Sequence, residues 1–172
     1  HDYWQLANKN VTIWMPQNSK DAASALRAEF GLPSVTINTP LSISKMVPFG
    51  PNEVLKKAGV FPEMIPDLKG ITGDSSDNIP GVPKIGEKTA TSLMVTYGSL
   101  DEIYAHLEEI EKKSIRESLK ENKDLADLSL ALARIKTDCD IPLCVEILNE
   151  FHRVFDMGLA SVGVIDARST LG

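Results

Sequence analysis

Apolar and polar residues along the first fifty positions follow patterns that predict two short strands and one helix. A β-branched and aromatic run over 11–14 predicts a strand, and 35–38 is a second candidate. Between them, apolar residues spaced three and four apart predict a helix that begins near Asn18 and Asp21 and ends at Gly31. A proline-rich irregular stretch then leads to residue 51.

From residue 51 onward the apolar spacing becomes helical, with repeats at i, i+3, i+4 and i+7. Gly98 ends one such repeat, and Ser99 with Glu102 forms a capping box that begins the next helix. These patterns predict a mainly α protein with a small β part. The apolar positions that define the helices are Val54, Leu55 and Ala58; Met64, Ile65 and Leu68; Ala90, Leu93, Met94 and Tyr97; Leu100, Ile103, Tyr104, Leu107 and Ile110; Ile115 and Leu119; and Leu125, Leu128, Leu132 and Ile135.

Composition and charge narrow the class of protein. The chain has 172 residues, 42% of them hydrophobic, which suits one compact domain or two small ones. Its net charge of −6 argues against a general nucleic-acid coat, because phosphate binding uses Lys and Arg. The acidity is local, however: the net charge is +1 over 1–70, −1 over 71–98 and −6 over 99–172. A DNA-binding surface before residue 99 is therefore compatible with the net charge of −6.

The cysteine content and the hydropathy favour an ordinary intracellular protein. Cys139 and Cys144, with three scattered histidines, assemble neither a disulfide framework nor a zinc site. No apolar run approaches the roughly 20 residues that a membrane-spanning helix needs. We therefore expect a cytoplasmic, monomeric chain with free thiols and no membrane partner.

A turn bounded by Gly81 and Gly86 precedes one of the predicted helices. The two glycines permit backbone conformations and close approaches that a Cβ would block. The first amides of the next helix lack partners within it and, with the positive end of the helix dipole, form an anion site. Lys84 and Lys88 add charges suited to a phosphodiester backbone, read without sequence preference. For this turn alone, a surface hairpin with routine glycines remains an equal alternative.

Two aspartates lie just before that turn. Asp74 and Asp77 are three residues apart in a Gly-Asp-Ser-Ser-Asp-Asn segment, so one tight turn aims both carboxylates the same way. Such a pair is unfavourable unless a cation lies near it, and hard oxygen ligands suit Mg²⁺ or Mn²⁺. Taken alone, the segment is more often a plain turn. Beside a phosphate-binding hairpin, the segment is a more specific sign of a metal site, because the two elements could hold the same phosphodiester strand.

Four segments together resemble a known family. Residues 73–90 are Gly-Asp-Ser-Ser-Asp-Asn-Ile-Pro-Gly-Val-Pro-Lys-Ile-Gly-Glu-Lys-Thr-Ala, and 97–100 are Tyr-Gly-Ser-Leu. Residues 132–138 are Leu-Ala-Arg-Ile-Lys-Thr-Asp, and 2–6 are Asp-Tyr-Trp-Gln-Leu. These segments resemble the 5′→3′ exonuclease domain of bacterial DNA polymerase I, which belongs to the flap-endonuclease family.

The resemblance implies a set of site residues and ions. Asp2, Asp74 and Asp77 would be catalytic carboxylates that help to bind the second of two divalent cations, Mg²⁺ or Mn²⁺. The backbone carbonyls of Val82 and Ile85 would hold a monovalent cation, K⁺, against a DNA phosphate. The DNA-binding residues that it implies are Gly81, Val82, Lys84, Ile85, Gly86, Lys88 and Thr89.

The resemblance also implies three parts. Residues 1–50 would be a truncated remnant of an α/β catalytic (PIN-like) subdomain, 51–142 a helix–three-turn–helix (helix-hairpin-helix) DNA-binding subdomain with its following helices, and 143–172 stay unassigned. The chain would then be the C-terminal half of an α/β 5′-nuclease fold. We expect a nucleoid-associated hydrolase that cleaves duplex DNA at a 5′ end or flap in replication and repair. Without the N-terminal half, which would carry the first-metal carboxylates, the chain alone should be inactive.

Two other classes of function stay open at this point. A non-catalytic helix-hairpin-helix module would bind DNA through the hairpin with no need of divalent metal, so Lys84 would matter and the aspartates would not. A helical interaction protein would instead use the acidic faces of the C-terminal helices to meet a basic partner. Absence of DNA binding at low salt would favour the interaction protein.

Overall fold

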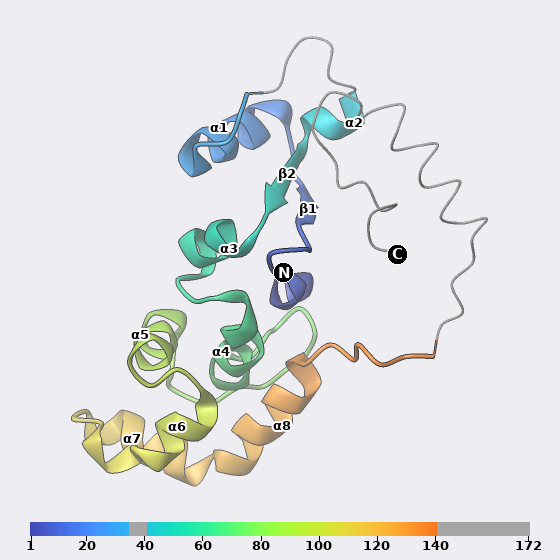
Figure 1. Ribbon diagram of the computed structural model, residues 1–172. Coiled ribbons are helices and arrows are strands. Elements are labelled where there is room, and N and C mark those ends of the chain that lie inside the picture. The colour runs from blue at the N-terminus through green and yellow to red at the C-terminus, as the bar shows by residue number, and fades with distance from the viewer. Residues whose placement is uncertain (35–40, 141–172) are drawn as a thin grey trace. The chain divides into compact units, whose positions relative to one another are not determined.

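The computed structural model describes residues 1–34 and 41–140, which fall into two compact units (Figure 1). Of the described residues, the first unit comprises 1–15 and 48–137, and the second comprises 16–34, 41–47 and 138–140. The predicted strand at 35–38 and the unassigned segment from 143 to the C-terminus lie outside the described residues.

Helices make up most of the described chain, with one two-stranded sheet of β1 and β2. This confirms the predicted mainly α class with a small β part. No helix among the described residues is long and apolar enough to cross a membrane. In chain order the elements are the 3₁₀ helix η1 (Asp2–Leu6), β1 (Ile13–Pro16), α1 (Lys20–Phe30), α2 (Leu41–Ser44), β2 (Met46–Phe49), α3 (Pro51–Ala58), η2 (Pro62–Met64), α4 (Ile65–Thr72), α5 (Glu87–Tyr97), α6 (Leu100–Ala105), η3 (Leu107–Glu109), α7 (Lys113–Glu121) and α8 (Lys123–Ala133).

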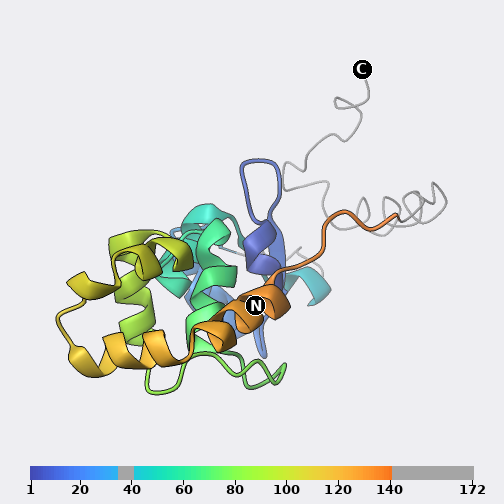
Figure 2. The ribbon, with the colours of Figure 1, turned by 90° about the horizontal axis from the view of Figure 1, so that it is seen from below.

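The centre of the first unit is α4, which contacts α5, α6, α8 and η1. Figures 1 and 2 both show α8 running alongside α4. The two helices approach closely at Gly70, where an added Cβ would lie 3.1 Å from the Cβ of Leu130. Apolar side chains surround α4 and exclude water from the core. Those that are almost fully buried include Ile71, Met94, Leu100, Ile103 and Leu119.

The close approach at Gly70 explains why the predicted apolar face of the last helix is wrong. The sequence pattern favoured a stripe that includes Leu128 and Leu132, but these side chains are 52% and 57% exposed. The buried face of α8 is instead made of Ala126, Ser129 and Ala133. Small side chains are required there because larger ones would push α8 away from α4.

Three other local predictions also need correction. Ser19 caps α1, because its hydroxyl accepts a hydrogen bond from the Ala22 amide, whereas we expected Asn18 or Asp21. The strand β2 lies within the stretch expected to be irregular. The single helix expected over 100–110 ends at Ala105 and continues as the short η3.

The second unit contains α1, whose Arg27 side chain is buried. Its guanidinium donates to the carbonyl oxygens of Met46, at 2.9 Å, and Pro33, at 3.2 Å. These carbonyl oxygens provide hydrogen-bond acceptors for the buried guanidinium within the unit. The bonds also hold α1 against the segments that follow it. The domain limits expected from the sequence, at residues 50 and 142, stay a prediction.

Candidate metal centre and nucleic-acid interface

The three predicted carboxylates lie together in the first unit. Asp2 belongs to η1, whereas Asp74 and Asp77 belong to the loop that follows α4. One carboxylate oxygen from each residue lies within 4.8 Å of those from the other two. Carboxylates at this spacing repel one another unless a cation lies between or beside them.

The loop that carries Asp74 and Asp77 is a tight and specific structure. Asp74 and Ile79 exchange two backbone hydrogen bonds, both of 2.8 Å, which close the loop. Asn78 adopts a left-handed backbone with φ of 58°, a conformation that Asn tolerates better than most residues. The Asp74 Oδ1 atom accepts hydrogen bonds from the amide and the hydroxyl of Ser76, at 3.0 and 2.6 Å. The loop therefore fixes the Asp74 carboxylate and leaves that of Asp77 exposed.

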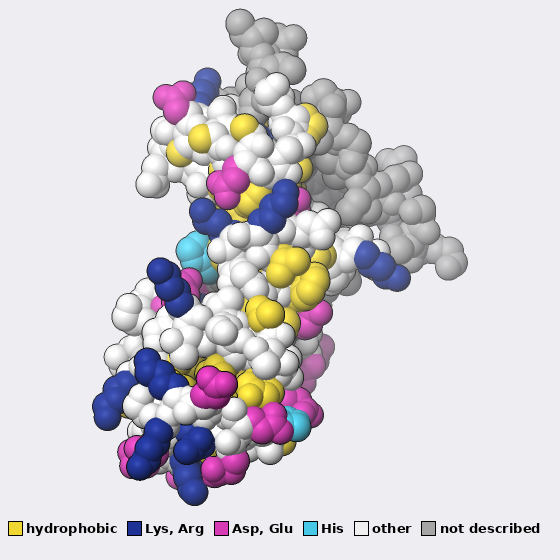
Figure 3. Space-filling model, turned by 90° about the vertical axis from the view of Figure 1, so that its left-hand side faces the viewer, with side chains coloured by type: hydrophobic (Ala, Val, Ile, Leu, Met, Phe, Trp, Pro, Cys, Tyr) yellow, Lys and Arg dark blue, Asp and Glu magenta, His cyan; other side chains and the backbone are white. Residues whose placement is uncertain are grey.

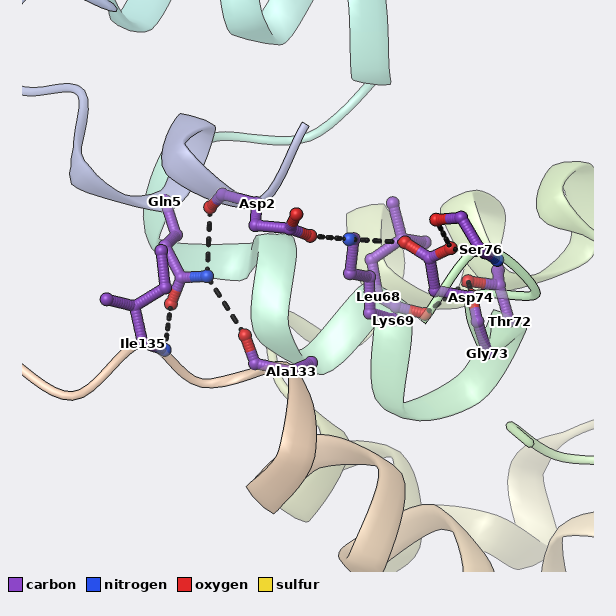
Figure 4. Close-up of polar contacts among 10 residues, drawn as sticks. All are labelled: Asp2, Gln5, Leu68, Lys69, Thr72, Gly73, Asp74, Ser76, Ala133 and Ile135. Carbon is purple, nitrogen blue, oxygen red and sulfur yellow. Dashed lines mark hydrogen bonds and ion pairs between the residues drawn. The ribbon is translucent and has the colours of Figure 1, made fainter. Parts of the chain in front are cut away.

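A lysine that the sequence analysis did not single out lies between two of these acids. The Lys69 ammonium donates to Asp2 Oδ1 and, at 2.6 Å, to Asp74 Oδ2 (Figure 4). The hydrogen bond from Lys69 holds the pKa of both carboxyl groups below their ordinary value, and for Asp74 the hydroxyl of Ser76 acts in the same direction. Burial disfavours the Lys69 ammonium, but the two carboxylates outweigh it and raise the pKa of Lys69.

Gln5 fixes the position of Asp2 relative to the end of α8. Its amide nitrogen donates to the carbonyl oxygens of Asp2, at 2.9 Å, and Ala133, at 3.0 Å. Its amide oxygen accepts the backbone N–H of Ile135 at 3.0 Å, as Figure 4 shows. One side chain thus joins η1 to the segment after α8.

Two open clefts flank the acidic cluster. The first, of about 530 Å³, is bordered by Lys69 and Asp74 and further lined by residues that include Trp4 and Lys57. The second, of about 400 Å³, is lined by Asp2 and Asp77 together with Ile79, Leu132, Ala133, Arg134, Ile135 and Lys136. The second cleft therefore presents carboxylates and cationic side chains to the same space.

The predicted hairpin is packed against the loop that holds the acids. Gly81 has φ of +66°, and an added Cβ would lie 2.2 Å from the backbone nitrogen of Gly73. The Gly81 N–H donates to the hydroxyl of Ser129 at 3.0 Å, and Val82 N–H donates to the Ile71 carbonyl at 2.7 Å. Glycine is required at position 81 because two backbone segments cross there.

The hairpin buries its apolar side chains and exposes its basic ones. Val82 and Ile85 are 4% and 5% exposed, whereas Lys84 and Lys88 are exposed. Lys84 has φ of 66°, a left-handed backbone that is uncommon for a residue with a Cβ. Gly86 is the N-cap of α5, and its carbonyl accepts the amides of Thr89 and Ala90 at 3.0 Å. The amide of Thr89 is thus committed to the helix.

Comparison with known proteins identifies the family of this chain. The sequence model of the family described as "5′-3′ exonuclease, C-terminal SAM fold" matches residues 60–152, more than half of the chain. The chain belongs to the 5′-3′ exonuclease family. This membership confirms the resemblance stated from the four sequence segments.

The chain is similar in sequence to three longer proteins. It is 42% identical over 143 residues to the 5′-3′ exonuclease of Buchnera aphidicola subsp. Baizongia pistaciae, covering 80% of this chain and 45% of that protein. It is 42% identical over 115 residues to DNA polymerase I of Bacillus caldotenax, covering 66% of this chain and 13% of that protein. With DNA polymerase I of Caldicellulosiruptor bescii the identity is 52% over 94 residues, 55% of this chain and 11% of that protein. The chain thus spans less than half the length of these relatives.

Sequence reasoning found the carboxylates of this exonuclease-family chain but missed two groups that organise them. Lys69 precedes Asp74 by five residues, and only the turn after α4 brings the two side chains together. Gln5 was quoted as part of a motif but was given no role. Its contacts with residues 128 and 130 positions away leave no local signal in the sequence.

The surface around α6 and α7 shows no single sign of charge. Figure 3 shows basic and acidic side chains interspersed over the lower part of the view, where these helices lie in Figure 1. Ion pairs occur along these helices and the next one, such as Lys113 with Glu117 at 3.5 Å in α7 and Lys123 with Asp127 at 2.7 Å in α8. Paired charges of this kind are typical of a solvated helix surface.

Proposed function

We propose that this chain carries the second-metal carboxylates and the DNA-binding hairpin of a metal-dependent, structure-specific 5′→3′ nuclease. The observation that carries the proposal is the clustering of the Asp2, Asp74 and Asp77 carboxylates within 4.8 Å. The hairpin packs against the loop that supplies Asp74 and Asp77. Because the chain spans only part of its relatives, the activity, substrate and partners of the whole protein are part of the proposal.

The donor set fits a hard divalent cation. Three carboxylates supply only oxygen ligands, which Mg²⁺ and Mn²⁺ prefer over softer metals. Asp2, Asp74 and Asp77 would hold the ion. When bound, divalent cations supply an activated water and stabilise charge on a phosphodiester.

The chain's own residues would bind and orient the DNA strand. Lys84, exposed on the hairpin, and Lys88, exposed in the first turn of α5, would contact backbone phosphates without reading base edges. The first amides of α5 add a partial positive charge beside them. The backbone carbonyls of Val82 and Ile85 are proposed to hold K⁺ against the same phosphates. The proposed partner is duplex DNA with a 5′ end or flap, at the nucleoid.

Cleavage by an intact homologue tests the catalytic part of the proposal. In that protein, replacement by Ala of the aspartate that matches Asp77 should abolish Mg²⁺-dependent cleavage of a 5′-flap substrate. Binding of the same substrate, measured in the presence of Ca²⁺, should change little. Retention of cleavage would show that the metal assignment is wrong.

DNA binding by this chain tests the interface. Lys84→Ala should weaken binding to duplex DNA. It should also reduce the magnitude of the slope of log K, the binding constant, against log salt concentration by about 0.9, the value for one phosphate contact. Lys9→Ala removes the same charge from an exposed lysine outside the hairpin and is the matched control. Equal effects of the two variants would reject the hairpin as the interface. A DNA-binding module without catalysis would instead show the Lys84 effect while Asp77 stayed dispensable in the homologue.

A further inference from the structure

The Lys69 ammonium lies where two of the proposed metal ligands meet. It donates to Asp2 Oδ1 and to Asp74 Oδ2, and its side chain is 12% exposed, less than those of its partners at 42% and 20%. Lys69 extends from the last turn of α4, a helix packed on several sides. The contact is therefore partly buried and differs from a fully exposed surface pair.

Both oxygens of Asp74 already have partners. Oδ2 accepts from Lys69, and Oδ1 accepts from the amide and the hydroxyl of Ser76. A divalent cation bound through Asp2 and Asp74 would lie beside the Lys69 ammonium, because Lys69 donates to both carboxylates. Two cations so close to each other repel strongly.

We propose that the acidic site takes up its divalent cation in exchange for the Lys69 ammonium, which serves as an internal counter-ion while the metal is out. This inference rests on the proposed function, because it assumes that Asp2, Asp74 and Asp77 form a metal site. Lys69 compensates the mutual repulsion of the carboxylates and keeps them in place. It thereby sets the metal affinity of the site, and it is a positioning residue.

The structure provides space for the displaced side chain. Lys69 borders the cleft of about 530 Å³, whose lining also includes His1, Lys57 and Thr72. The lysine stem is flexible and can turn into this cleft without moving α4. Once released, the ammonium is a free donor beside the site, suited to a phosphate oxygen of a bound strand.

Manganese binding to the full chain tests the exchange, with free Mn²⁺ followed by electron paramagnetic resonance. Lys69→Met removes the competing charge and keeps a side chain of similar length. It should tighten Mn²⁺ binding about tenfold or more, because the contribution of this partly buried ion pair lies between those of exposed and fully buried pairs. Lys69→Arg keeps a cation and should stay close to the wild-type affinity. Lys57→Met removes the same charge from an exposed lysine that lines the same cleft and, among the described residues, forms no ion pair with the three acids. It should change the Mn²⁺ affinity less than about twofold.

The outcomes separate this inference from the function on which it rests. Unchanged or weaker Mn²⁺ binding by folded Lys69→Met, with binding still lost in Asp77→Ala, would overturn the exchange and leave the metal site standing. Absence of Mn²⁺ binding in both wild type and Lys69→Met would overturn both. A gain in Lys57→Met equal to that in Lys69→Met would reduce the effect to net charge and overturn the exchange.

A measurement on the wild-type chain keeps the inference testable if Lys69→Met fails to fold. Acetylation of individual lysines by an amine-reactive reagent can be followed by mass spectrometry with and without Mg²⁺. Mg²⁺ should increase the acetylation rate of Lys69 several-fold and leave that of Lys57 unchanged. An unchanged rate at Lys69 under conditions where the metal is bound would overturn the exchange.

Discussion

Replacement of Gly81 by alanine should destabilise the first unit more than any other small change in the hairpin. The residue has φ of +66°, and a left-handed backbone costs an L-residue with a Cβ about 1–2 kcal/mol. The added Cβ would also lie 2.2 to 2.7 Å from the backbone of Thr72 and Gly73, which cannot rotate away. Forcing atoms into packed structure costs a further 1–3 kcal/mol or so. We expect a total loss of about 2–5 kcal/mol.

Gly86→Ala is the matched control for this prediction. Gly86 has φ of −87°, and no atom lies within 4 Å of the Cβ that would be added. Only its role as the N-cap of α5 is affected, with a cost of up to about 1 kcal/mol. Calorimetry should show Gly81→Ala melting at least about 8 °C below wild type, at roughly 4 °C or more per kcal/mol. Similar melting temperatures for the two alanine variants would refute the steric argument.

Three further changes probe other parts of the first unit. Ser129→Ala leaves the buried Gly81 N–H without its 3.0 Å acceptor and should lower the urea-derived unfolding free energy by about 1–3 kcal/mol; an unchanged midpoint would contradict this. Burial raises the pKa of Tyr104 to about 12, so Tyr104 ionises at a lower pH in the unfolded chain than in the folded one. The free energy of unfolding should therefore fall between about pH 10 and 12. In denaturation measured across this range, Tyr104→Phe should remove that part of the decrease. Glu109 accepts a hydrogen bond from the His106 ring and thereby raises the pKa of His106. The stabilisation of the folded state by this contact is therefore complete below about pH 6.5, the ordinary histidine pKa, and is lost as the pH rises through the higher pKa of His106 in the folded chain. Glu109→Gln should lower the His106 pKa in an NMR titration, and an unchanged pKa would exclude the contact.

Local patterns predicted much of the fold because they depend on neighbours in the sequence. Gly31 and Gly98 were expected to end helices, and both have positive φ at the C-cap of α1 and α5. Ser99 was expected to cap a helix, and its hydroxyl accepts the Glu102 amide at 3.2 Å. These features are set by backbone geometry within one turn, so a single sequence is enough to find them.

Features that depend on distant packing could not be found in this way. The buried stripe of α8 contains Ala126 and Ser129 because α4 approaches closely at Gly70, and apolar periodicity alone favoured the leucines. In the candidate site, Asp74 and Asp77 were paired from their spacing, whereas Asp2 was added only through the resemblance. Nothing in the sequence placed a lysine between the acids, since that contact needs η1 and α4 to be adjacent.

The bonds of Gln5 have a consequence for the order in which the chain is made. Gln5 joins the turn that carries Asp2 to the backbone of Ala133 and Ile135, 128 and 130 residues later. Because synthesis runs from the N-terminus, this segment leaves the ribosome several seconds or more after Asp2, at about 5–20 residues per second. Before then, Asp2 lacks the restraint that Gln5 provides. The acidic cluster is therefore fully restrained only after residue 135 has been synthesised, so a chain cut before residue 133 should hold Asp2 less firmly beside Asp74.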